Sequence, residues 1–260
     1  MRLGSTVRLE SSPGRIIRGV GSLLDFMKLF PDLDFFELYC SYPFPLSLMD
    51  DVAKIKTFLK NNNQSIGLHF PVEWNDLWMK NVKYDEMRSI IINFANAVEA
   101  DYVNVHPDDL ATFLKNRNDE IIKNELERIS ALVSCLTVEN GHSVYNNPGD
   151  LDNFLNIKNV KLCLDFCHVY QSDFEFKDFR HYVDNTFLFH LSDVRERAHL
   201  ELGAGALPVA NIISRLKHTN CYGLLLETLL VQNADSVFRD PAKATRNSIS
   251  FLRNSVETFV

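Results

Sequence analysis

The side chains that could carry chemistry in this chain are acidic or imidazole groups placed where short apolar runs end. In chain order these positions are Glu37, His69, His106, Glu139, Asp165, His190 and Glu227. Such groups brought together without an equal number of Lys or Arg residues would repel one another or stay protonated. A bound divalent cation resolves that conflict. Because the ligand atoms are mixed oxygen and nitrogen, we expect Mn, Zn, Co or Fe rather than Mg or Ca.

Each of these residues taken alone has an ordinary structural explanation. A single Glu or Asp after a strand is commonly a helix cap, and a single buried His is commonly a core residue. Glu37 is the weakest member of the set, because its apolar run alternates least regularly. His142, His181 and His218 lie off the ends of the runs and are interpreted as structural. Only the convergence of several run ends at one place would make a metal site.

A parallel barrel would supply that convergence. β-Rich apolar runs recur roughly every 25 to 37 residues, separated by segments with helical periodicity. The predicted strands are 2–7, 34–39, 65–69, 102–106, 135–139, 161–165, 186–190 and 223–227. The predicted helices are 46–59, 84–100, 109–132, 176–183, 208–218 and 241–258. Strands alternating with helices predict a single (β/α)8 TIM barrel, whose strands end at one mouth, with a doubly wound open sheet as the alternative.

The alternation within the strands favours the barrel. Counting by twos from the strand ends gives a wholly apolar outer set, which a covering layer of helices requires. This set comprises Ile66, Leu68, Val103, Val105, Leu136, Val138, Leu162, Leu164, Phe187, Phe189, Leu224 and Leu226. The opposite, inner set is mixed in polarity, as the crowded interior of a barrel permits. It comprises Gly67, Asn104, Thr137, Cys163, Leu188 and Leu225.

The composition predicts a soluble protein that folds as one domain over residues 1–260, since no linker or low-complexity run divides the chain. Lys plus Arg number 27 against 34 Asp plus Glu, giving a formal net charge of −7. That balance makes nucleic acid a less favoured partner and argues against a membrane surface. The five cysteines show no CxxC spacing, and no apolar run has the length of a signal peptide or membrane span. We therefore expect reduced thiols and a cytoplasmic location, while the oligomeric state is not indicated.

Two features follow predicted strand ends. His168 comes three residues after Asp165, where a turn would bring its imidazole back toward the mouth as a contact to a second metal or to substrate, and a structural role explains it equally well. After the seventh strand, Gly203 and Gly205 flank Ala204. Backbone amides of such a loop can approach an anion or a sugar oxygen, and an ordinary turn explains the glycines equally well.

These motifs, in this order along nearly the whole chain, resemble the xylose isomerase-like TIM-barrel superfamily. The matching pieces are FELY at 36–39, GLHFP at 67–71, VNVHP at 103–107, TVEN at 137–140, CLDFCH at 163–168, FHLSD at 189–193, HLELGAG at 199–205 and LLLET at 224–228. That superfamily holds sugar and sugar-phosphate isomerases and epimerases together with endonuclease IV. The resemblance is specific for the superfamily and much less so for a reaction.

The resemblance implies which residues bind metal. The ligands shared by both branches correspond to Glu139, Asp165, His190 and Glu227. The additional ligands of the trinuclear zinc site of endonuclease IV correspond to His69, His106, His168 and His199. Endonuclease IV also has an aspartate two residues before the last of these histidines. Here that position is Arg197, a cation where a third zinc ion would need an anion, so one or two ions are expected, the second at His69 and His106.

The resemblance also implies an activity. The favoured hypothesis is a metal-dependent isomerase or epimerase of a small polyhydroxy carbonyl compound, a sugar or sugar phosphate. Glu139 and Glu227 would transfer a proton between them, and His168 would hold a substrate oxygen. The other predicted substrate contacts are His199, Arg195 or Arg197 for a phosphate or carboxylate, and Trp74 for stacking on a sugar face. The alternative is an endonuclease IV-like zinc phosphodiesterase that acts at abasic sites in DNA, motivated by His69 and His106.

Overall fold

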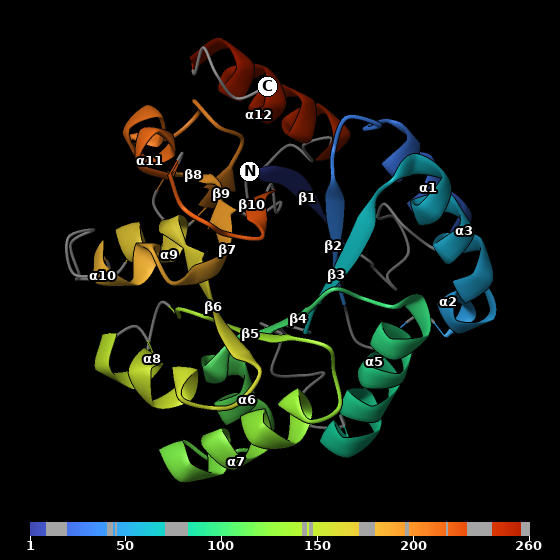
Figure 1. Ribbon diagram of the computed structural model, residues 1–260, viewed down its shortest axis with the longest axis vertical. Coiled ribbons are helices and arrows are strands. Elements are labelled where there is room, and N and C mark those ends of the chain that lie inside the picture. The colour runs from blue at the N-terminus through green and yellow to red at the C-terminus, as the bar shows by residue number, and fades with distance from the viewer. Residues whose placement is uncertain are drawn as a thin grey trace.

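The computed structural model describes residues 1–8, 20–40, 44, 46–70, 83–141, 145, 148–171, 180–195, 198–216, 218–227 and 241–255 (Figure 1). The strands are β1 Arg2–Arg8, β2 Phe35–Tyr39, β3 Ser65–His69, β4 Val103–Val105, β5 Leu136–Glu139, β6 Val160–Asp165, β7 Thr186–Leu191, β8 Asp193–Arg195, β9 Ala198–Leu200 and β10 Gly223–Leu226. The helices are α1 Val20–Lys28, α2 Ser47–Asp50, α3 Val52–Asn62, α5 Tyr84–Val98, α6 Pro107–Phe113, α7 Asp119–Ser130, α8 Pro148–Leu155, α9 Phe166–Gln171, α10 Arg180–Val183, α11 Val209–Leu216 and α12 Pro241–Ser255.

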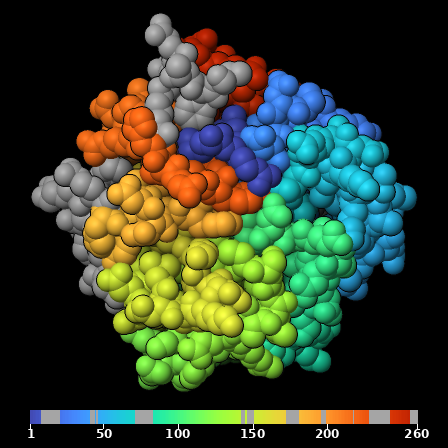
Figure 2. All heavy atoms as spheres, in the orientation of Figure 1, coloured from blue at the N-terminus to red at the C-terminus, as the bar shows by residue number. Residues whose placement is uncertain are grey.

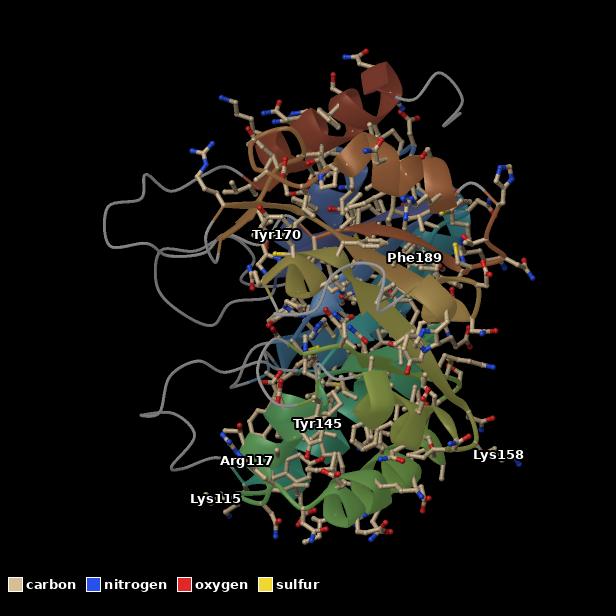
Figure 3. All side chains as sticks on the ribbon, turned by 90° about the vertical axis from the view of Figure 1, so that its left-hand side faces the viewer. Lys115, Arg117, Tyr145, Lys158, Tyr170 and Phe189 are labelled. Atoms are coloured by element: carbon tan, nitrogen blue, oxygen red, sulfur yellow. The ribbon has the colours of Figure 1, made fainter. Side chains whose placement is uncertain are left out.

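Eight parallel strands close into a barrel in the order β1-β10-β7-β6-β5-β4-β3-β2, with the helices around it (Figure 1). β1 pairs with both β2 and β10, so the sheet has no free edge. That closure confirms the predicted (β/α)8 barrel and excludes the open-sheet alternative. Figure 3 shows the barrel from the side, with Lys158 before β6 toward one end and Tyr170 after β6 toward the other, where the strands end.

The predicted strands agree with the observed ones to within two residues, and the helices differ more. The segment predicted as one helix over 109–132 is two helices, because Lys115 has a φ of 51° and Asn118 starts α7 by accepting the amides of Glu120 and Ile121. The segment predicted over 46–59 likewise divides at Asp51. Helices α1, α8 and α9 and the antiparallel pair β8–β9 were not predicted. Residues 176–179 and 256–258 of two predicted helices lie outside the described chain.

The outer face of the barrel is apolar, as the alternation predicts. Its side chains pack with the helices in two large clusters. Phe187 is the exception: it packs inside the barrel with Tyr102 and Tyr222, so its placement in the outer set was wrong. The physical reason is a shift in the pairing of β6 with β7, where Leu162 pairs with Thr186 and Cys163 with Leu188. The shift leaves Phe187 without a partner on β6 and turns its side chain inward.

Aromatic rings fill the barrel where its strands begin. The Tyr222 ring lies 5.1 Å from that of Phe35, 5.4 Å from that of Tyr102 and 5.0 Å from that of Phe187. The Arg2 guanidinium lies over Tyr222, 4.3 Å from its ring centre. Figure 2 shows this end of the barrel, with the first residues of the chain beside the segment before β10 over its middle. We call Phe35, Tyr102, Phe187 and Tyr222, together with Arg2, the aromatic floor. The polar inner side chains lie toward the opposite end of the barrel.

We predict that Gly67→Ala destabilises the protein by about 1–3 kcal/mol, the usual cost of overpacking a core. A Cβ at Gly67 would overlap the Tyr102 ring of the aromatic floor. Urea unfolding followed by circular dichroism measures the change. Gly21→Ala is the matched control, because a Cβ at this exposed position in α1 meets nothing within 4 Å and should leave stability unchanged or slightly higher. Equal stabilities of the two variants would contradict the role given to Gly67.

Candidate metal centre

Four acidic and imidazole side chains converge inside the barrel where its strands end. Glu139 ends β5, Asp165 ends β6, His190 lies near the end of β7, and Glu227 directly follows β10. Each offers a ligand atom, and these atoms all lie within 4.8 Å of one another. Glu139, Asp165 and His190 are fully buried, and Glu227 is 3% exposed. The structure therefore brings together the four residues predicted from the sequence as metal ligands; we call them the four-residue group.

The four-residue group holds polar atoms that lack a hydrogen bond. Within the described chain, this is true of Glu139 Oε1, Asp165 Oδ2, both ring nitrogens of His190 and Glu227 Oε2. The second carboxylate oxygen of Asp165 does accept a bond, from the amide of His168 at 2.6 Å. Buried polar atoms without partners are costly, and carboxylates this close repel one another. A divalent cation fits this donor set, since it would satisfy these atoms at once.

A second cluster adjoins the first and shares Glu139 with it. The Nε2 atoms of His69 and His106 each lie 3.3 Å from Glu139 Oε2, the oxygen on the other side of the carboxylate from the unpartnered one. The Nδ1–H of His69 donates to the Phe70 carbonyl at 2.8 Å, so Nε2 is the ring nitrogen that faces Glu139. His69, His106 and Glu139 thus form a second group of possible ligands, where the sequence predicts a second ion.

Glu139 is held in place by a chain of side chains from β4 and β5. The hydroxyl of Thr137 donates to Asn104 Oδ1 at 2.7 Å, and the amide of Asn104 donates to Glu139 Oε2. The hydroxyl fixes which end of the Asn104 amide faces the carboxylate, because Oδ1 is occupied. Asn104 and Thr137, predicted only as inner-facing residues, therefore orient the carboxylate common to both groups.

His168 and His199 complete an arc of imidazoles. Successive ring centres lie 5.1 Å apart from His69 to His106, 5.2 Å from His106 to His168 and 5.6 Å from His168 to His199. The Nδ1–H of His168 donates to the Asn140 carbonyl at 2.8 Å, so its Nε2 carries the lone pair. His199 Nδ1 lies 2.9 Å from the Ser192 hydroxyl and 3.6 Å from Glu227 Oε2. Both histidines are thus beside the four-residue group.

The site shifts the pKa of each group according to its neighbours. Burial would raise the pKa of Glu139, but His106, His190 and His69 lower it well below its usual range. Burial raises the pKa of Asp165 to about 7. Burial opposes the charged form of His69, yet the Glu139 hydrogen bond and the charge of Glu37 raise its pKa to about 9. Burial lowers the pKa of His199 to about 4. The cluster thus combines an ionised carboxylate with neutral and cationic neighbours.

The predicted substrate contacts are only partly placed. Trp74 and Arg197 lie outside the described residues. Arg195 is exposed, and its guanidinium donates to the Ala204 carbonyl at 2.8 Å, which ties it to the loop after β9. Whether any of the three contacts a substrate stays a prediction.

The amides of the Gly203–Gly205 loop are already occupied. The buried carboxylate of Asp193 accepts the backbone amides of Gly203, Gly205 and Leu207 at 2.8–2.9 Å, along with that of Val194. A Cβ at Gly205 would overlap Asp193 and the backbone of Val194. The ordinary turn is therefore the correct interpretation of these glycines, and an anion site at their amides is wrong.

Two further residues join the site. Glu37 forms a possible ligand group with His69 and His190, and Cys163 forms one with Glu139 and His190. Glu37 is not at the end of its strand as expected: it pairs with Gly67 two residues before the end of β2, one layer deeper than His69. Its irregular run concealed this depth. Cys163 was recognised as inner-facing, but spacing alone gives no sign that it approaches His190.

The comparisons with known proteins agree with this architecture. The family model described as xylose isomerase-like TIM barrel matches residues 32–255 of the chain. The chain belongs to the xylose isomerase-like TIM-barrel family. No curated protein sequence matches it significantly.

Solved structures of this fold include both nucleases and epimerases. Endonuclease IV from Thermus thermophilus is 18% identical, with a TM-score of 0.68 and 99% of each chain covered. The 3-keto-D-glucoside 4-epimerase YcjR from E. coli is 16% identical, with a TM-score of 0.66, 98% of this chain and 99% of that chain covered. D-Psicose 3-epimerase from Clostridium cellulolyticum is 12% identical, with a TM-score of 0.65 and 98% of each chain covered. At these identities the likeness shows the fold alone.

We predict that the affinity for Zn²⁺ rises as the pH increases from about 6 to about 8. Asp165 and His69 have raised pKa values, about 7 and about 9, so both hold protons in this range that a cation must displace. Competition with a chromophoric chelator, corrected for its own protonation, measures the dissociation constant at each pH. An affinity that stays flat or falls over this range would show that these two groups are not displaced by the ion.

Proposed function

We propose that the chain is a divalent-metal-dependent isomerase or epimerase of a small polyhydroxy carbonyl compound, a sugar or sugar phosphate. One observation carries the proposal: the four-residue group places two carboxylates beside one imidazole nitrogen. Glu139 Oε1 lies 3.3 Å and Glu227 Oε2 lies 3.6 Å from His190 Nδ1. The two come from β5 and from the end of β10, which β6 and β7 separate in the barrel. Carboxylates on two sides of one centre suit proton removal on one face of a carbon and return on the other.

In the proposed reaction, each residue of the site has a separate role. A bound divalent ion would polarise a substrate carbonyl and acidify the hydrogen on the neighbouring carbon. Glu139 is ionised at neutral pH, because its histidine neighbours hold its pKa low, and it accepts that proton. Glu227 returns a proton from the other side. His168, whose Nδ1 is occupied by the Asn140 carbonyl, presents Nε2 to a substrate oxygen.

The metal belongs to the same proposal. The four-residue group supplies three carboxylates and one imidazole, and the adjoining cluster supplies His69 and His106 with the shared Glu139. Mixed oxygen and nitrogen donors favour Mn, Zn, Co or Fe, as one ion or two. Arg195, Arg197, Trp74 and His199 remain proposed substrate contacts.

Two features of the chain bear on its cellular setting. None of the helices in the described part of the chain is long and apolar enough to cross a membrane. All five cysteines are free thiols, which is the usual state in a reducing compartment. A cytoplasmic enzyme with a small-molecule substrate is the proposal these features support.

We predict that the protein forms an isomer of its sugar substrate that carries a solvent hydrogen on the reacting carbon, and that Glu227→Gln lowers the rate of isomer formation at least about 100-fold. The amide cannot return a proton, while the volume of the side chain is kept. Candidate ketoses and their phosphates are incubated with metal-loaded protein in D2O, and deuterium incorporation is followed by NMR. Glu120→Gln, an exposed position in the first turn of α7, is the control. Isomer formation by Glu227→Gln at the wild-type rate would refute the proton-transfer role.

A second candidate function is a zinc phosphodiesterase that acts at abasic sites in DNA. The observation that favours it is the His69–His106–Glu139 cluster, which would give a second ion a place beside the first. Two ions that share a carboxylate suit phosphoester cleavage, whereas proton transfer requires only one ion. Lys115 and Arg117 are exposed on the same side of the barrel as Tyr170 (Figure 3), which adds basic groups near the end where the strands finish. The net charge of −7 opposes general binding of DNA.

Metal content separates the two functions. We predict one tightly held ion per chain, and no cleavage of a duplex containing an abasic analogue, for protein purified without chelators. Elemental analysis gives the stoichiometry, and gel electrophoresis of a labelled duplex detects nicking. Two zinc ions together with specific nicking, lost in His106→Gln, would establish the phosphodiesterase and overturn the isomerase.

A further inference from the structure

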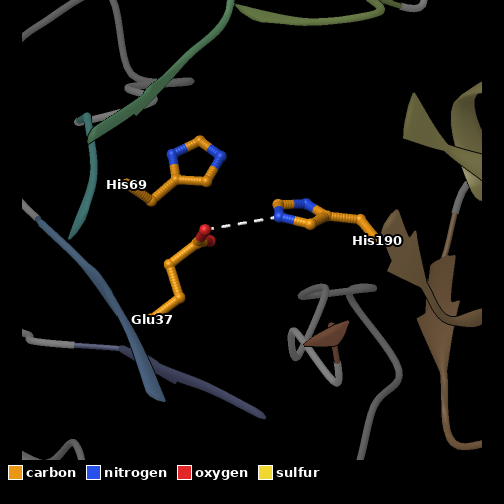
Figure 4. Close-up of side chains that lie close together, drawn as sticks. All are labelled: Glu37, His69 and His190. Carbon is orange, nitrogen blue, oxygen red and sulfur yellow. Dashed lines mark ion pairs between the residues drawn. The ribbon is translucent and has the colours of Figure 1, made fainter. Parts of the chain in front are cut away.

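Glu37 is a fully buried carboxylate inside the barrel, and the proposed proton transfer assigns it no role. It lies one layer below the strand ends, and neither of its oxygens makes a hydrogen bond within the described chain. Its neighbours in the site are two imidazoles: Glu37 Oε2 lies 3.3 Å from His190 Nε2, and His69 belongs to the same group of possible ligands (Figure 4). A buried carboxylate with so little compensation is costly to the fold. Its position therefore calls for an explanation other than stability.

The two ring nitrogens of His190 face different carboxylates. Nδ1 lies toward Glu139 and Glu227, at 3.3 and 3.6 Å, and thus toward the four-residue group. Nε2 lies toward Glu37. A neutral imidazole has one N–H and one lone pair, and the partner of one nitrogen decides which it is. Binding of an ion displaces the Nδ1 proton, and with the Nε2 proton directed at Glu37 the Nδ1 lone pair then faces the four-residue group.

In two other histidines of the site, a hydrogen bond to a backbone carbonyl fixes which ring nitrogen carries the proton. The Nδ1–H of His69 donates to the Phe70 carbonyl, and that of His168 donates to the Asn140 carbonyl, both at 2.8 Å. No such carbonyl bond is found for His190, whose two nitrogens lack hydrogen bonds within the described chain. Cys163 also approaches the ring, but burial raises the pKa of its thiol, which stays neutral. Glu37 is thus the carboxylate acceptor on the Nε2 side.

We propose that Glu37 is a positioning residue that accepts the Nε2–H of His190 and thereby holds the Nδ1 lone pair toward the metal position. A carboxylate behind a ligating imidazole fixes its tautomer and increases its basicity, and removal of such a partner typically weakens metal binding about 10- to 100-fold. The contact of 3.3 Å is longer than a charge-assisted hydrogen bond, about 2.7–2.9 Å, so a small ring rotation would align it. The inference rests on the proposed metal-dependent function and adds to it the residue that sets ligand geometry.

The role predicts opposite effects of Glu37→Gln on stability and on metal binding. The substitution removes a buried, poorly compensated charge while keeping its shape, so the melting temperature of the metal-free protein should be unchanged or higher. The dissociation constant for Zn²⁺, measured by chelator competition, should rise about 10- to 100-fold. A residue retained only for the fold would give the reverse, with a lower melting temperature and unchanged affinity.

The tautomer gives a second readout. Long-range ¹⁵N–¹H NMR spectra of the zinc-loaded protein should show His190 bound through Nδ1 with a proton on Nε2. In Glu37→Met, which keeps similar length but cannot accept a hydrogen bond, the Nε2 proton should exchange faster and its signal should broaden or vanish. An unchanged Nε2–H signal in this variant would overturn the proposal.

Glu125→Gln is the matched control, because Glu125 is also a buried carboxylate but pairs with Arg88 between α5 and α7. It should lower the melting temperature and leave zinc affinity unchanged. The failures are distinguishable: wild-type protein that binds no divalent ion refutes the proposed function, whereas wild-type binding that Glu37→Gln leaves intact refutes the role of Glu37 alone.

Discussion

The burial of ionisable groups inside a closed barrel is the constraint on which the rest of this structure depends. Glu37, Glu139, Asp165 and His190 are all fully buried, in an interior where a charge without a partner is expensive. Neighbouring residues bind some of their carboxylate oxygens and leave others without a hydrogen bond. One oxygen of Glu139 is taken by Asn104 and one of Asp165 by the His168 amide, and the remaining oxygens point at their neighbours. The fold therefore confers a defined direction on each donor atom and leaves a local excess of negative charge for a cation to neutralise.

Sharing of Glu139 between the two clusters makes them one electrostatic unit. Its Oε2 faces His69 and His106, and its Oε1 faces His190. Any charge placed at one cluster alters the other through a single carboxylate, which the Thr137–Asn104 chain prevents from turning away. This coupling explains why the same arrangement of residues can suit a proton-transfer enzyme and a phosphoester-cleaving enzyme. The number of ions bound, rather than the ring of ligands, distinguishes the two chemistries.

Much of the fold and the composition of the site could be predicted from the sequence, because a strand exposes alternate residues to the same face. The strand pattern places Glu139, Asp165, His190 and Glu227 among the strand-end residues without knowledge of contacts, and the family resemblance singles them out as ligands. The pattern fails where pairing is irregular: Phe187 faces inward because β6 and β7 shift register. It also gives no depth, so Glu37 was expected at a strand end and lies a layer below. The Asp193 carboxylate that occupies the loop amides depends on distant backbone geometry, which spacing does not encode.

Within the described residues, the aromatic floor closes one end of the barrel and leaves the end where the strands finish as the entrance. Phe35, Tyr102, Phe187 and Tyr222 fill the end where the strands begin, with Arg2 over Tyr222. Under the proposed function, ion and substrate would arrive by the same route, and the deeper of the two would arrive first. A substrate bound in the mouth would block dissociation of the ion beneath it for as long as the substrate stays bound. In the proposed enzyme, turnover and ion exchange would use one passage, so the protein saturated with substrate would retain its metal longer than the protein without substrate.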